Sequence, residues 1–434
     1  MEDHHTTVAV VGLGFIGLPL ALSYAMEGIN VVGVDVNEEL VRRIGDGESD
    51  LEESFEGRTI EDILKRELES GRFRPTTEYA EAAAAANDYV ITVGLPVNGG
   101  KVDFSPLDSC IRSLGNILKP DDLVLLRSTL VPGTTLERVA PLLEEISGMR
   151  AGRDFYLAYS SERIAEGRAF EEFRHMPLAV GGIDIESAER ARRVLSLVTE
   201  AKITVSDIAT VETAKILENL QRDINIAVSQ EFASFADALD IDTYELIRVA
   251  NTHRRVNLLT PGPGVGGYCL PYALHYLMPR AEEFGVDLPL ARLARSINRD
   301  TPVRMVRRLA SLLETVGKEI EGSHVAVIGL AMKDYSGDDR ESPALQIVKA
   351  LAEAGATVTA HDPVIPDGRP FTCTDLAEAL RGADALIVAA RQRSFDRADW
   401  PELLQLMAAD PVIVDTRHLL DDLRLRSDAV VWRI

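Results

Sequence analysis

The sequence predicts an α/β protein with two doubly wound domains joined by a long helical segment. Short apolar runs alternate with helical patterns between Val8 and Ala158, and a long helical pattern begins at Ala209. The alternation restarts at His324. Strands separated by helix-length segments are typical of parallel sheets covered by helices. Because 434 residues are too many for one hydrophobic core, we expect domains at 1–205, 206–315 and 316–434.

The composition is that of a globular protein with an acidic bias. The chain is 46% hydrophobic and 26% charged, and its formal net charge is −23. Such a charge argues against nucleic acid or an anionic membrane surface as a partner. No apolar run is long enough to span a bilayer. The basic residues are 8 Lys and 38 Arg, a bias that fits either a salt-adapted surface or a GC-rich genome.

The two features that bear on the compartment are the start of the chain and the cysteines. The acidic start leads directly into the first apolar run, unlike a secretory signal. Cys110, Cys269 and Cys373 are widely spaced, which predicts neither a disulfide framework nor a metal site. We therefore expect a protein of the reducing cytoplasm.

A glycine motif follows the first apolar run. The segment Gly12-Leu13-Gly14-Phe15-Ile16-Gly17 precedes a helical pattern, and the next strand ends at Asp35. This order of strand, glycine turn, helix, strand and acid is the dinucleotide fingerprint, in which a pyrophosphate lies at the helix N-terminus. Asp35 would bind the ribose hydroxyls and repel a 2′-phosphate, so we expect NAD. The alternative is a simple tight turn.

Three further strands end in polar or proline-containing loops. Tyr89–Val93 ends at Pro96, Leu123–Leu126 ends at Ser128 and Thr129, and Phe155–Ala158 ends at Glu162. Ligands of parallel sheets gather at the carboxyl ends of the strands. These loops are therefore candidate site loops, although Ser128 and Thr129 could instead cap a helix.

A long helix is predicted from Ala209 to about Leu239. Lys215, Asn219 and Arg222 are spaced i, i+4 and i+7, so they share one helix face. That face is either solvated or part of a site. Apolar residues occupy much of the remaining surface, which predicts a homodimer.

One cysteine directly follows a run rich in glycine. Four glycines lie within the six positions 262–267, and Cys269 comes two residues later. Glycine allows positive φ and close approach to the backbone, so this thiol is placed for access rather than for packing. A basic cluster at Asn251–Val256 lies shortly before this run.

The C-terminal domain lacks a second glycine fingerprint. No dinucleotide is therefore expected there. Lys333 and Arg340 follow the strand His324–Leu330, where a phosphate would lie. Their alternative role is ion pairing with the neighbouring aspartates Asp334, Asp338 and Asp339.

The whole arrangement resembles the nucleotide-sugar 6-dehydrogenases, the UDP-glucose/GDP-mannose dehydrogenase family. The resemblance covers essentially the whole chain. It is strongest in Glu212–Glu231, Glu245–Cys269 and Gly329–Ala344. The pair Glu162-Arg163, the run Arg222-Asp223-Ile224-Asn225 and the His253…Arg255 cluster are similar to the UDP-N-acetylmannosamine branch.

The resemblance implies a Rossmann-like fold and a four-electron oxidation of a UDP-N-acetylhexosamine to its uronic acid. Among these sugar nucleotides, the resemblance points first to UDP-N-acetylmannosamine. It implies that Cys269 forms a thiohemiacetal and then a thioester. It also implies that Lys215 is the general base or oxyanion stabiliser, with Asn219 beside it, and that Glu162 assists water or a proton relay. UDP-glucose or UDP-N-acetylglucosamine is the alternative substrate. A nucleotide-sugar-binding protein that has lost turnover is the alternative of another class.

The resemblance also implies two sets of binding residues. The NAD contacts are expected from Gly12, Gly14, Phe15, Ile16, Gly17, Asp35, Val93, Pro96, Ser128, Thr129 and Arg340. The sugar nucleotide contacts are expected from Arg163, Ile164, Lys215, Asn219, Arg222, His253, Arg255, Gly266, Met332 and Lys333. Guanidinium groups suit the diphosphate because they bind phosphate in bidentate fashion.

The chain departs from the family pattern near its cysteine. Ala273 stands four residues after Cys269, where the family usually carries an aspartate. Losing such a group predicts slower thioester hydrolysis, by on the order of 10²–10⁴-fold. Leu95 and Ser161 replace a usual threonine and proline, and neither change removes Cys269 or Lys215.

Overall fold

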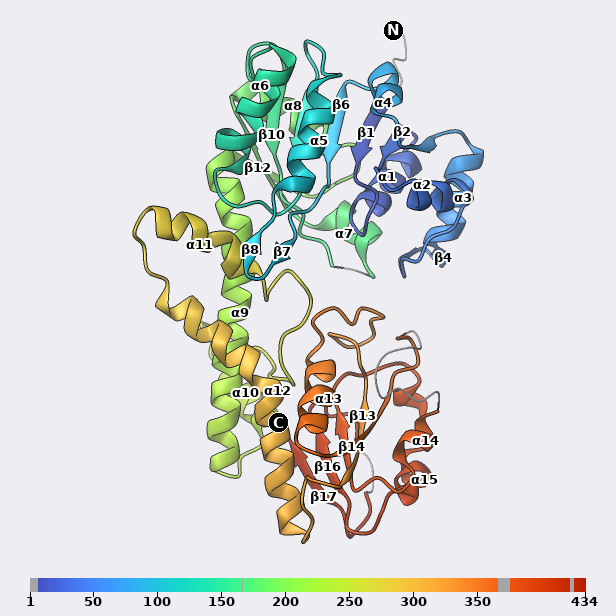
Figure 1. Ribbon diagram of the computed structural model, residues 1–434, viewed down its shortest axis with the longest axis vertical. Helices are drawn as coiled ribbons and strands as arrows, with labels where there is room; N and C mark the ends of the chain where they lie inside the picture. Colours follow the sequence, from blue (N-terminus) through green and yellow to red (C-terminus); the bar gives the residue numbers. More distant parts are fainter. Residues whose placement is uncertain (1–6, 166, 366–374, 422–424) are drawn as a thin grey trace. The chain divides into compact units, whose positions relative to one another are not determined.

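The computed structural model describes residues 7–165, 167–365, 375–421 and 425–434 (Figure 1). It confirms the predicted α/β class. The chain divides into two compact units, Met1–Leu217 with His275–Gly285 and Glu218–Leu274 with Val286–Ile434. The predicted three-domain boundaries stay a prediction. Among the described residues, every helix is too short or too polar to cross a membrane.

The first unit is built on an eight-stranded sheet. Its strand order is β12-β11-β10-β9-β6-β1-β2-β5. Neighbouring strands are parallel except β10 and β11. The strands are β1 Thr7–Val11, β2 Asn30–Val34, β5 Phe73–Thr76, β6 Asp88–Ile91, β9 Leu123–Leu126, β10 Tyr156–Tyr159, β11 Leu178–Gly182 and β12 Ile203–Asp207. Two small ribbons pair β3 Ser54–Phe55 with β4 Arg58–Thr59, and β7 Val97–Asn98 with β8 Lys101–Val102.

Both faces of this sheet are buried, as expected for strands with helices on each side. In β1, Val8 and Val10 belong to one apolar cluster, and Ala9 and Val11 belong to the other. The helices are α1 Gly17–Met26, α2 Glu38–Gly45, α3 Ile60–Glu69, α4 Tyr79–Ala85, α5 Ser105–Gly115, α6 Ala140–Ser147, α7 Ala169–His175 and α8 Ile185–Leu195, with a π-helical turn at Thr135–Val139 before α6.

Long helices follow the first sheet. The predicted central helix is α9, Ile208–Ala238, which has 31 residues and contains the boundary between the two units. It is followed by α10 Thr243–Ala250, α11 Ala273–Glu283 and α12 Pro289–Thr315. Within the second unit, buried Asp223 of α9 is bound by Arg295 and Asn298 of α12 at 2.8 Å each. These polar contacts fix α12 beside the second half of α9.

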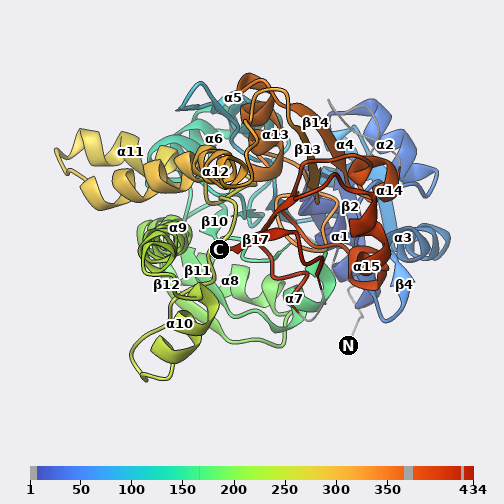
Figure 2. The ribbon, with the colours of Figure 1, turned by 90° about the horizontal axis from the view of Figure 1, so that it is seen from below.

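The second unit carries a five-stranded parallel sheet in the order β14-β13-β15-β16-β17. Its strands are β13 His324–Ile328, β14 Thr357–His361, β15 Ala385–Val388, β16 Val412–Asp415 and β17 Val430–Arg433. Helix α13 Pro343–Glu353 covers one face, and α14 Leu376–Leu380 and α15 Trp400–Leu403 cover the other (Figures 1 and 2). Short 3-10 turns lie at Phe395–Arg397 and Leu404–Leu406.

The two small ribbons were not predicted from the sequence, and within the two large sheets four strands were also missed, namely β5, β11, β12 and β17. Three of them, β5, β12 and β17, are the edges of their sheets. An edge strand needs no continuous apolar run, and β12 contains only exposed and half-buried residues. Pro75 is tolerated in β5 because an edge strand leaves backbone donors unpaired. The pattern therefore found every inner strand except β11 and missed every edge strand except β14.

The first prediction concerns the core of the second unit. Gly329 and Gly382 both have positive φ, +77° and +69°. A Cβ at Gly329 would lie 2.0 Å from the Ala390 carbonyl oxygen, whereas one at Gly382 would meet nothing within 4 Å. We expect Gly382→Ala to cost about 1–2 kcal/mol through backbone strain alone. Gly329→Ala should cost about 1–3 kcal/mol more because of overpacking.

Urea unfolding followed by tryptophan fluorescence measures this difference. Both tryptophans, Trp400 and Trp432, belong to the second unit, so the signal reports on that unit. Equal losses of stability in the two variants would contradict the described packing of Gly329.

Candidate functional site

The glycine turn between β1 and α1 is tightly closed on its inner side. Gly12 has φ +94°, and its N–H donates to the Val34 carbonyl at 2.7 Å. A Cβ at Gly17 would lie 1.7 Å from the Gly12 oxygen, while a Cβ at Gly14 would meet nothing within 4 Å. Two glycines therefore close the turn, and the backbone around Gly14 stays accessible to a ligand.

The start of α1 is open to an anion. Among the residues that the structure describes, no side chain caps this ten-residue helix, whose N-cap residue is Ile16. The first N–H groups of a helix lack intrahelical partners and carry a partial positive charge. Thr92 donates its hydroxyl to the Gly12 carbonyl at 2.7 Å, which fixes the turn from the neighbouring strand end.

Asp35 stands at the end of β2 beside this turn. Its carboxylate accepts the Leu13 N–H at 2.7 Å and the Asn37 N–H at 2.9 Å. The acid is thus held at the glycine turn in a fixed orientation. The open turn, the uncapped helix and the fixed acid fit a dinucleotide whose ribose hydroxyls face Asp35 and whose pyrophosphate faces α1.

The other predicted loops of this unit lie at the same carboxyl edge of the sheet. Val93 is half-buried and Pro96 is exposed after β6. Ser128 Oγ is buried without a hydrogen-bond partner among the described residues. Ser128 and Thr129 cap no helix, because the next helical turn begins at Thr135. The capping alternative for these two residues is therefore wrong.

Glu162 is held by a residue that sequence reasoning missed. Arg127, which is 1% exposed at the end of β9, forms an ion pair with Glu162 Oε2. The other carboxylate oxygen accepts the N–H groups of Arg163 at 2.7 Å and Ile164 at 3.1 Å. Arg163 also donates from its guanidinium to the Pro177 carbonyl at 2.7 Å. The sequence feature that could have revealed Arg127 is its position directly after the fully apolar strand β9.

A second missed residue is Glu212, one helical turn before Lys215. Its buried carboxylate accepts the N–H groups of Gly133 at 2.6 Å and Thr135 at 2.9 Å, and also the Thr135 hydroxyl at 2.5 Å. Burial raises the pKa of Glu212, and these donors oppose that rise. Glu212 thereby ties the loop that follows β9 to the first turns of α9.

The polar stripe of α9 is divided by burial. Lys215 and Asn219 are buried, whereas Arg222 is exposed. The alternative of a solvated helix face therefore fits the exposed Arg222, and it does not fit the buried Lys215 and Asn219. Lys215 belongs to the first unit, and Asn219 and Arg222 belong to the second.

The turn at residues 266–269, called the cysteine turn below, packs closely against the sheet domain of the second unit. A Cβ at Gly266 would lie 2.8 Å from Met332 Cβ, and one at Gly267 would lie 2.6 Å from Met332 Sδ. The Gly267 N–H donates to the Arg340 carbonyl at 2.8 Å, with Gly267 at φ +76°. Cys269 follows as an exposed free thiol. Close packing therefore requires glycine here, and it presents the thiol at the surface of this unit.

Aromatic and charged groups surround this turn. The Tyr268 ring lies 5.0 Å from the Arg340 guanidinium carbon and stacks on Tyr272, with ring centroids 5.4 Å apart. Tyr272 donates its hydroxyl to Glu341 at 3.0 Å. Glu341 has φ +50°, a strained conformation that is typical of functional sites. Glu341 therefore brings a carboxylate to the turn in which Ala273 supplies none.

The basic residues of the second unit differ in their surroundings. Arg340 donates from Nε to Asp338 at 2.8 Å, which agrees with the alternative that this arginine forms an ion pair with a neighbouring aspartate. Asp334 pairs instead with Arg417. Lys333 is exposed.

The basic cluster before the glycine run forms a loop of its own. His253 and Arg255 lie exposed in a loop closed by Asn251 and Leu258. Among the described contacts of this unit, none joins His253 or Arg255 to the cysteine turn.

The two remaining cysteines are outside this site. Cys110 is buried in α5, and burial raises the pKa of its thiol to about 11. Cys373 lies outside the described residues.

Comparisons with known proteins match the whole architecture. Three family models of the UDP-glucose/GDP-mannose dehydrogenases match in order: the NAD binding domain over residues 6–199, the central domain over 209–300 and the UDP binding domain over 326–422. The chain belongs to the UDP-glucose/GDP-mannose dehydrogenase family. It is an NAD-dependent UDP-sugar dehydrogenase, an oxidoreductase, as the resemblance implied.

Individual members of this family are similar over nearly their full length. The UDP-N-acetyl-D-mannosamine dehydrogenase of Pyrococcus horikoshii is 35% identical over 415 residues, 96% of each chain. Its solved structure has a TM-score of 0.90 at 33% identity and covers 98% of this chain and 99% of that one. The UDP-glucose dehydrogenase of Pyrobaculum islandicum has a TM-score of 0.86 at 27% identity, covering 99% and 98%.

The second prediction tests Asp35. Asp35→Asn keeps the shape but removes the charge and one of the acceptor oxygens. We expect the KM for NAD to rise about 10–100-fold, since a hydrogen bond to a charged group contributes about 1.5–3 kcal/mol, while turnover at saturating NAD changes little. NADH absorbance measures both constants. Asp46→Asn, at the exposed end of α2, is the control. An unchanged KM in Asp35→Asn would refute the assignment.

Proposed function

We propose that the chain oxidises the 6-hydroxyl of a UDP-N-acetylhexosamine, UDP-N-acetylmannosamine first among them, to a carboxylate. The alcohol, two NAD and one water give the uronic acid, two NADH and two protons. The names of the most similar relatives support this substrate. The exposed thiol of Cys269 on a closely packed turn supports the covalent route. When bound, NAD supplies the hydride acceptor for both oxidations.

The covalent step belongs to Cys269. The first oxidation turns the alcohol into an aldehyde. The Cys269 thiolate adds to the aldehyde carbon, so that a C–S bond forms and the carbonyl oxygen takes up a proton. The product is a thiohemiacetal. Oxidation of this adduct gives a thioester. Water then adds to the thioester carbonyl, the C–S bond breaks, and the thiol and the carboxylate are released.

Lys215, Asn219 and Glu162 are assigned to the proton transfers. Lys215 takes the hydroxyl proton in the first oxidation and stabilises the oxyanion afterwards, with Asn219 one turn away on the same helix. Their burial supports these roles. Glu162 assists the water, and its ion pair with buried Arg127 holds its carboxylate in place.

The binding roles follow the same proposal. NAD would be held by Gly12, Gly14, Phe15, Ile16, Gly17, Asp35, Val93, Pro96, Ser128, Thr129 and Arg340. The UDP-sugar would be held by Arg163, Ile164, Lys215, Asn219, Arg222, His253, Arg255, Gly266, Met332 and Lys333. The fit of the glycine turn supports the first set, and the contact between Gly266 and Met332 supports that pair within the second set.

Two alternatives have specific observations behind them. UDP-glucose is favoured by the likeness to the Pyrobaculum enzyme. Binding without turnover is favoured by Ala273, which is buried at the start of α11 where the family usually carries a carboxylate.

The assembly and the location also stay predictions. Phe232 and Phe235 of α9 are 43% and 65% exposed, which supports a homodimer that sedimentation velocity would test. Cytoplasmic location rests on the composition of the chain.

The third prediction is the stoichiometry of the reaction. The protein is incubated with NAD and, in turn, UDP-N-acetylmannosamine, UDP-N-acetylglucosamine or UDP-glucose, and NADH is read by absorbance. We expect two NADH per sugar with UDP-N-acetylmannosamine. If another sugar reacts faster, the substrate assignment is wrong. Tight sugar binding without NADH would establish the loss of turnover.

The fourth prediction separates the covalent step from binding. Cys269→Ser should lower the rate of complete oxidation by at least about 10²-fold, because a serine hydroxyl is a far weaker nucleophile than a thiolate. Its affinity for NAD should not change. Cys110→Ser is the matched control, since that thiol is buried in α5. Full turnover by Cys269→Ser would refute the covalent route.

A further inference from the structure

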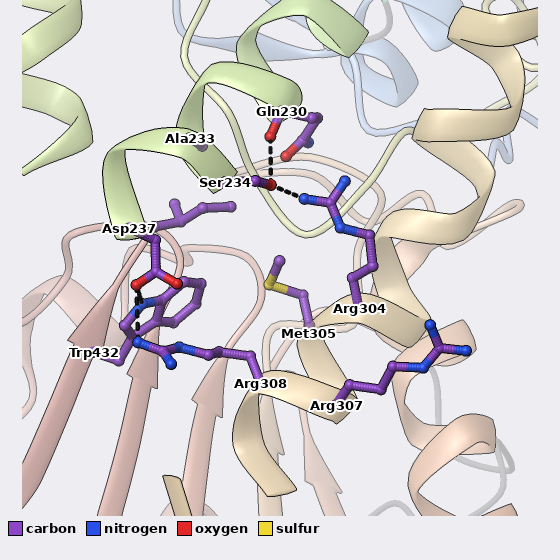
Figure 3. A pocket seen from close by; sticks show the side chains of 10 residues that line it. Gln230, Ala233, Ser234, Asp237, Arg304, Met305, Arg307, Arg308 and Trp432 are labelled. Atoms are coloured by element: carbon purple, nitrogen blue, oxygen red, sulfur yellow. Dashed lines mark hydrogen bonds and ion pairs between the residues drawn. The ribbon is translucent and has the colours of Figure 1, made fainter. Parts of the chain in front are cut away.

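A cavity of about 230 Å³ opens in the second unit between α9, α12 and the last strand, β17 (Figure 3). Residues of α9 form one wall, arginines of α12 form the other, and Trp432 of β17 lies at the floor. None of these residues has been assigned to the NAD, sugar or cysteine sites. The volume is small for a complete UDP-sugar, since sites for drug-sized ligands usually exceed about 300 Å³.

The cavity is basic in a strongly acidic protein. Arg304, Arg307 and Arg308 line it within five positions of α12, against one carboxylate, Asp237. The formal charge of the side chains that line the cavity is thus +2, whereas the whole chain carries −23. A positive cavity in such a chain concentrates small anions from solution.

The single acid is already occupied. Asp237 Oδ1 accepts Arg308 at 2.8 Å and the Trp432 indole N–H at 2.6 Å. Neither Arg304 nor Arg307 has a carboxylate partner among the described residues; Arg304 binds the Ser234 hydroxyl, and the Arg307 side chain is exposed. Two guanidinium charges therefore remain available at the cavity.

One donor in the wall is unused. Arg308 Nε is buried without a hydrogen-bond partner among the described residues, although its guanidinium carbon lies 5.5 Å from the centre of the Trp432 ring. A buried donor without a partner destabilises the folded state. Because this nitrogen is closed to solvent, an acceptor oxygen of a ligand reaches it only when the Arg308 side chain turns.

A buried side chain joins this cavity to the cysteine turn. Gln230, which is 2% exposed, lines the cavity and donates from Nε2 to the Gly262 carbonyl at 2.8 Å. Ser234, bound by Arg304, donates in turn to the Gln230 carbonyl at 3.0 Å. Gly262 opens the glycine run that leads to Cys269. A change at Arg304 can thus reach the thiol through three hydrogen bonds and the short segment from Gly262 to Cys269.

We propose that this cavity is a regulatory site for a small phosphate-bearing anion, whose binding alters the reactivity of Cys269 through Gln230. Planar guanidinium groups bind phosphate oxygens in bidentate fashion, and two uncompensated arginines match a doubly charged ligand. This inference can fail or hold independently of the proposed catalytic function, because pyrophosphate binding is measured without turnover.

The binding test uses inorganic pyrophosphate as the probe. Isothermal titration is performed on the full chain saturated with UDP and NADH, so that their own sites are filled. We expect one pyrophosphate per chain with a Kd below about 1 mM. Arg307→Glu should weaken binding at least about tenfold, as reversing one contacting charge requires. Arg299→Glu, on the same helix outside the cavity, makes the same change of charge, so it is the matched control and should bind as the parent chain does.

The coupling test measures the rate at which iodoacetamide alkylates Cys269, read by peptide mass spectrometry. Pyrophosphate should change this rate at least twofold in the parent chain. The effect should vanish in Arg307→Glu and in Gln230→Ala, while Gln230→Ala still binds pyrophosphate.

Three results would overturn the proposal. The first is no pyrophosphate binding. The second is equal weakening by Arg307→Glu and Arg299→Glu, which would show a general charge effect only. The third is binding that leaves Cys269 alkylation unchanged. Because Arg307 is exposed, its substitution is expected to leave folding intact, and the melting temperature checks this.

Discussion

The close approach of the Gly266–Gly267 backbone to Met332 is the constraint on which the second unit's chemistry depends. Side-chain atoms of Met332 lie where a Cβ at either glycine would stand, and the Arg340 carbonyl takes the Gly267 N–H. A turn fixed in this way has little freedom, so the residue after Tyr268 is presented at a defined place. Cys269 is that residue. The thiol's accessibility thus follows from backbone packing, and any larger side chain in the turn would move it.

In the first unit, buried charges play the corresponding part. Arg127 holds Glu162, and Glu212 holds the loop at Gly133 and Thr135. Each is a buried charge with a partner at the carboxyl end of the sheet, where an unpaired charge would be costly. These groups fix loops that carry predicted ligand contacts. Rigid support of this kind is what a site needs in order to hold reacting groups in place.

The sequence predicted the long helix, the glycine turn and all inner strands except β11, because each of these leaves a local pattern. The fingerprint from Gly12 to Asp35 is a good example, since spacing and residue type there decide the geometry. Edge strands such as β12 lack an apolar run and were missed. Arg127, Glu212 and Gln230 were also missed, because their partners are 35, 77 and 32 residues away in sequence. Only the fold brings those partners together.

Detection of a covalent intermediate on Cys269 is the decisive measurement for the proposed covalent route. The protein is mixed with UDP-N-acetylmannosamine and NAD, quenched in acid during turnover, and digested for peptide mass spectrometry. A UDP-uronyl adduct is expected on the peptide that carries Cys269, at a high level because Ala273 replaces the expected carboxylate and slows hydrolysis. Complete oxidation with no adduct on Cys269 at any time point, together with undiminished turnover after the thiol is blocked, would contradict the covalent route.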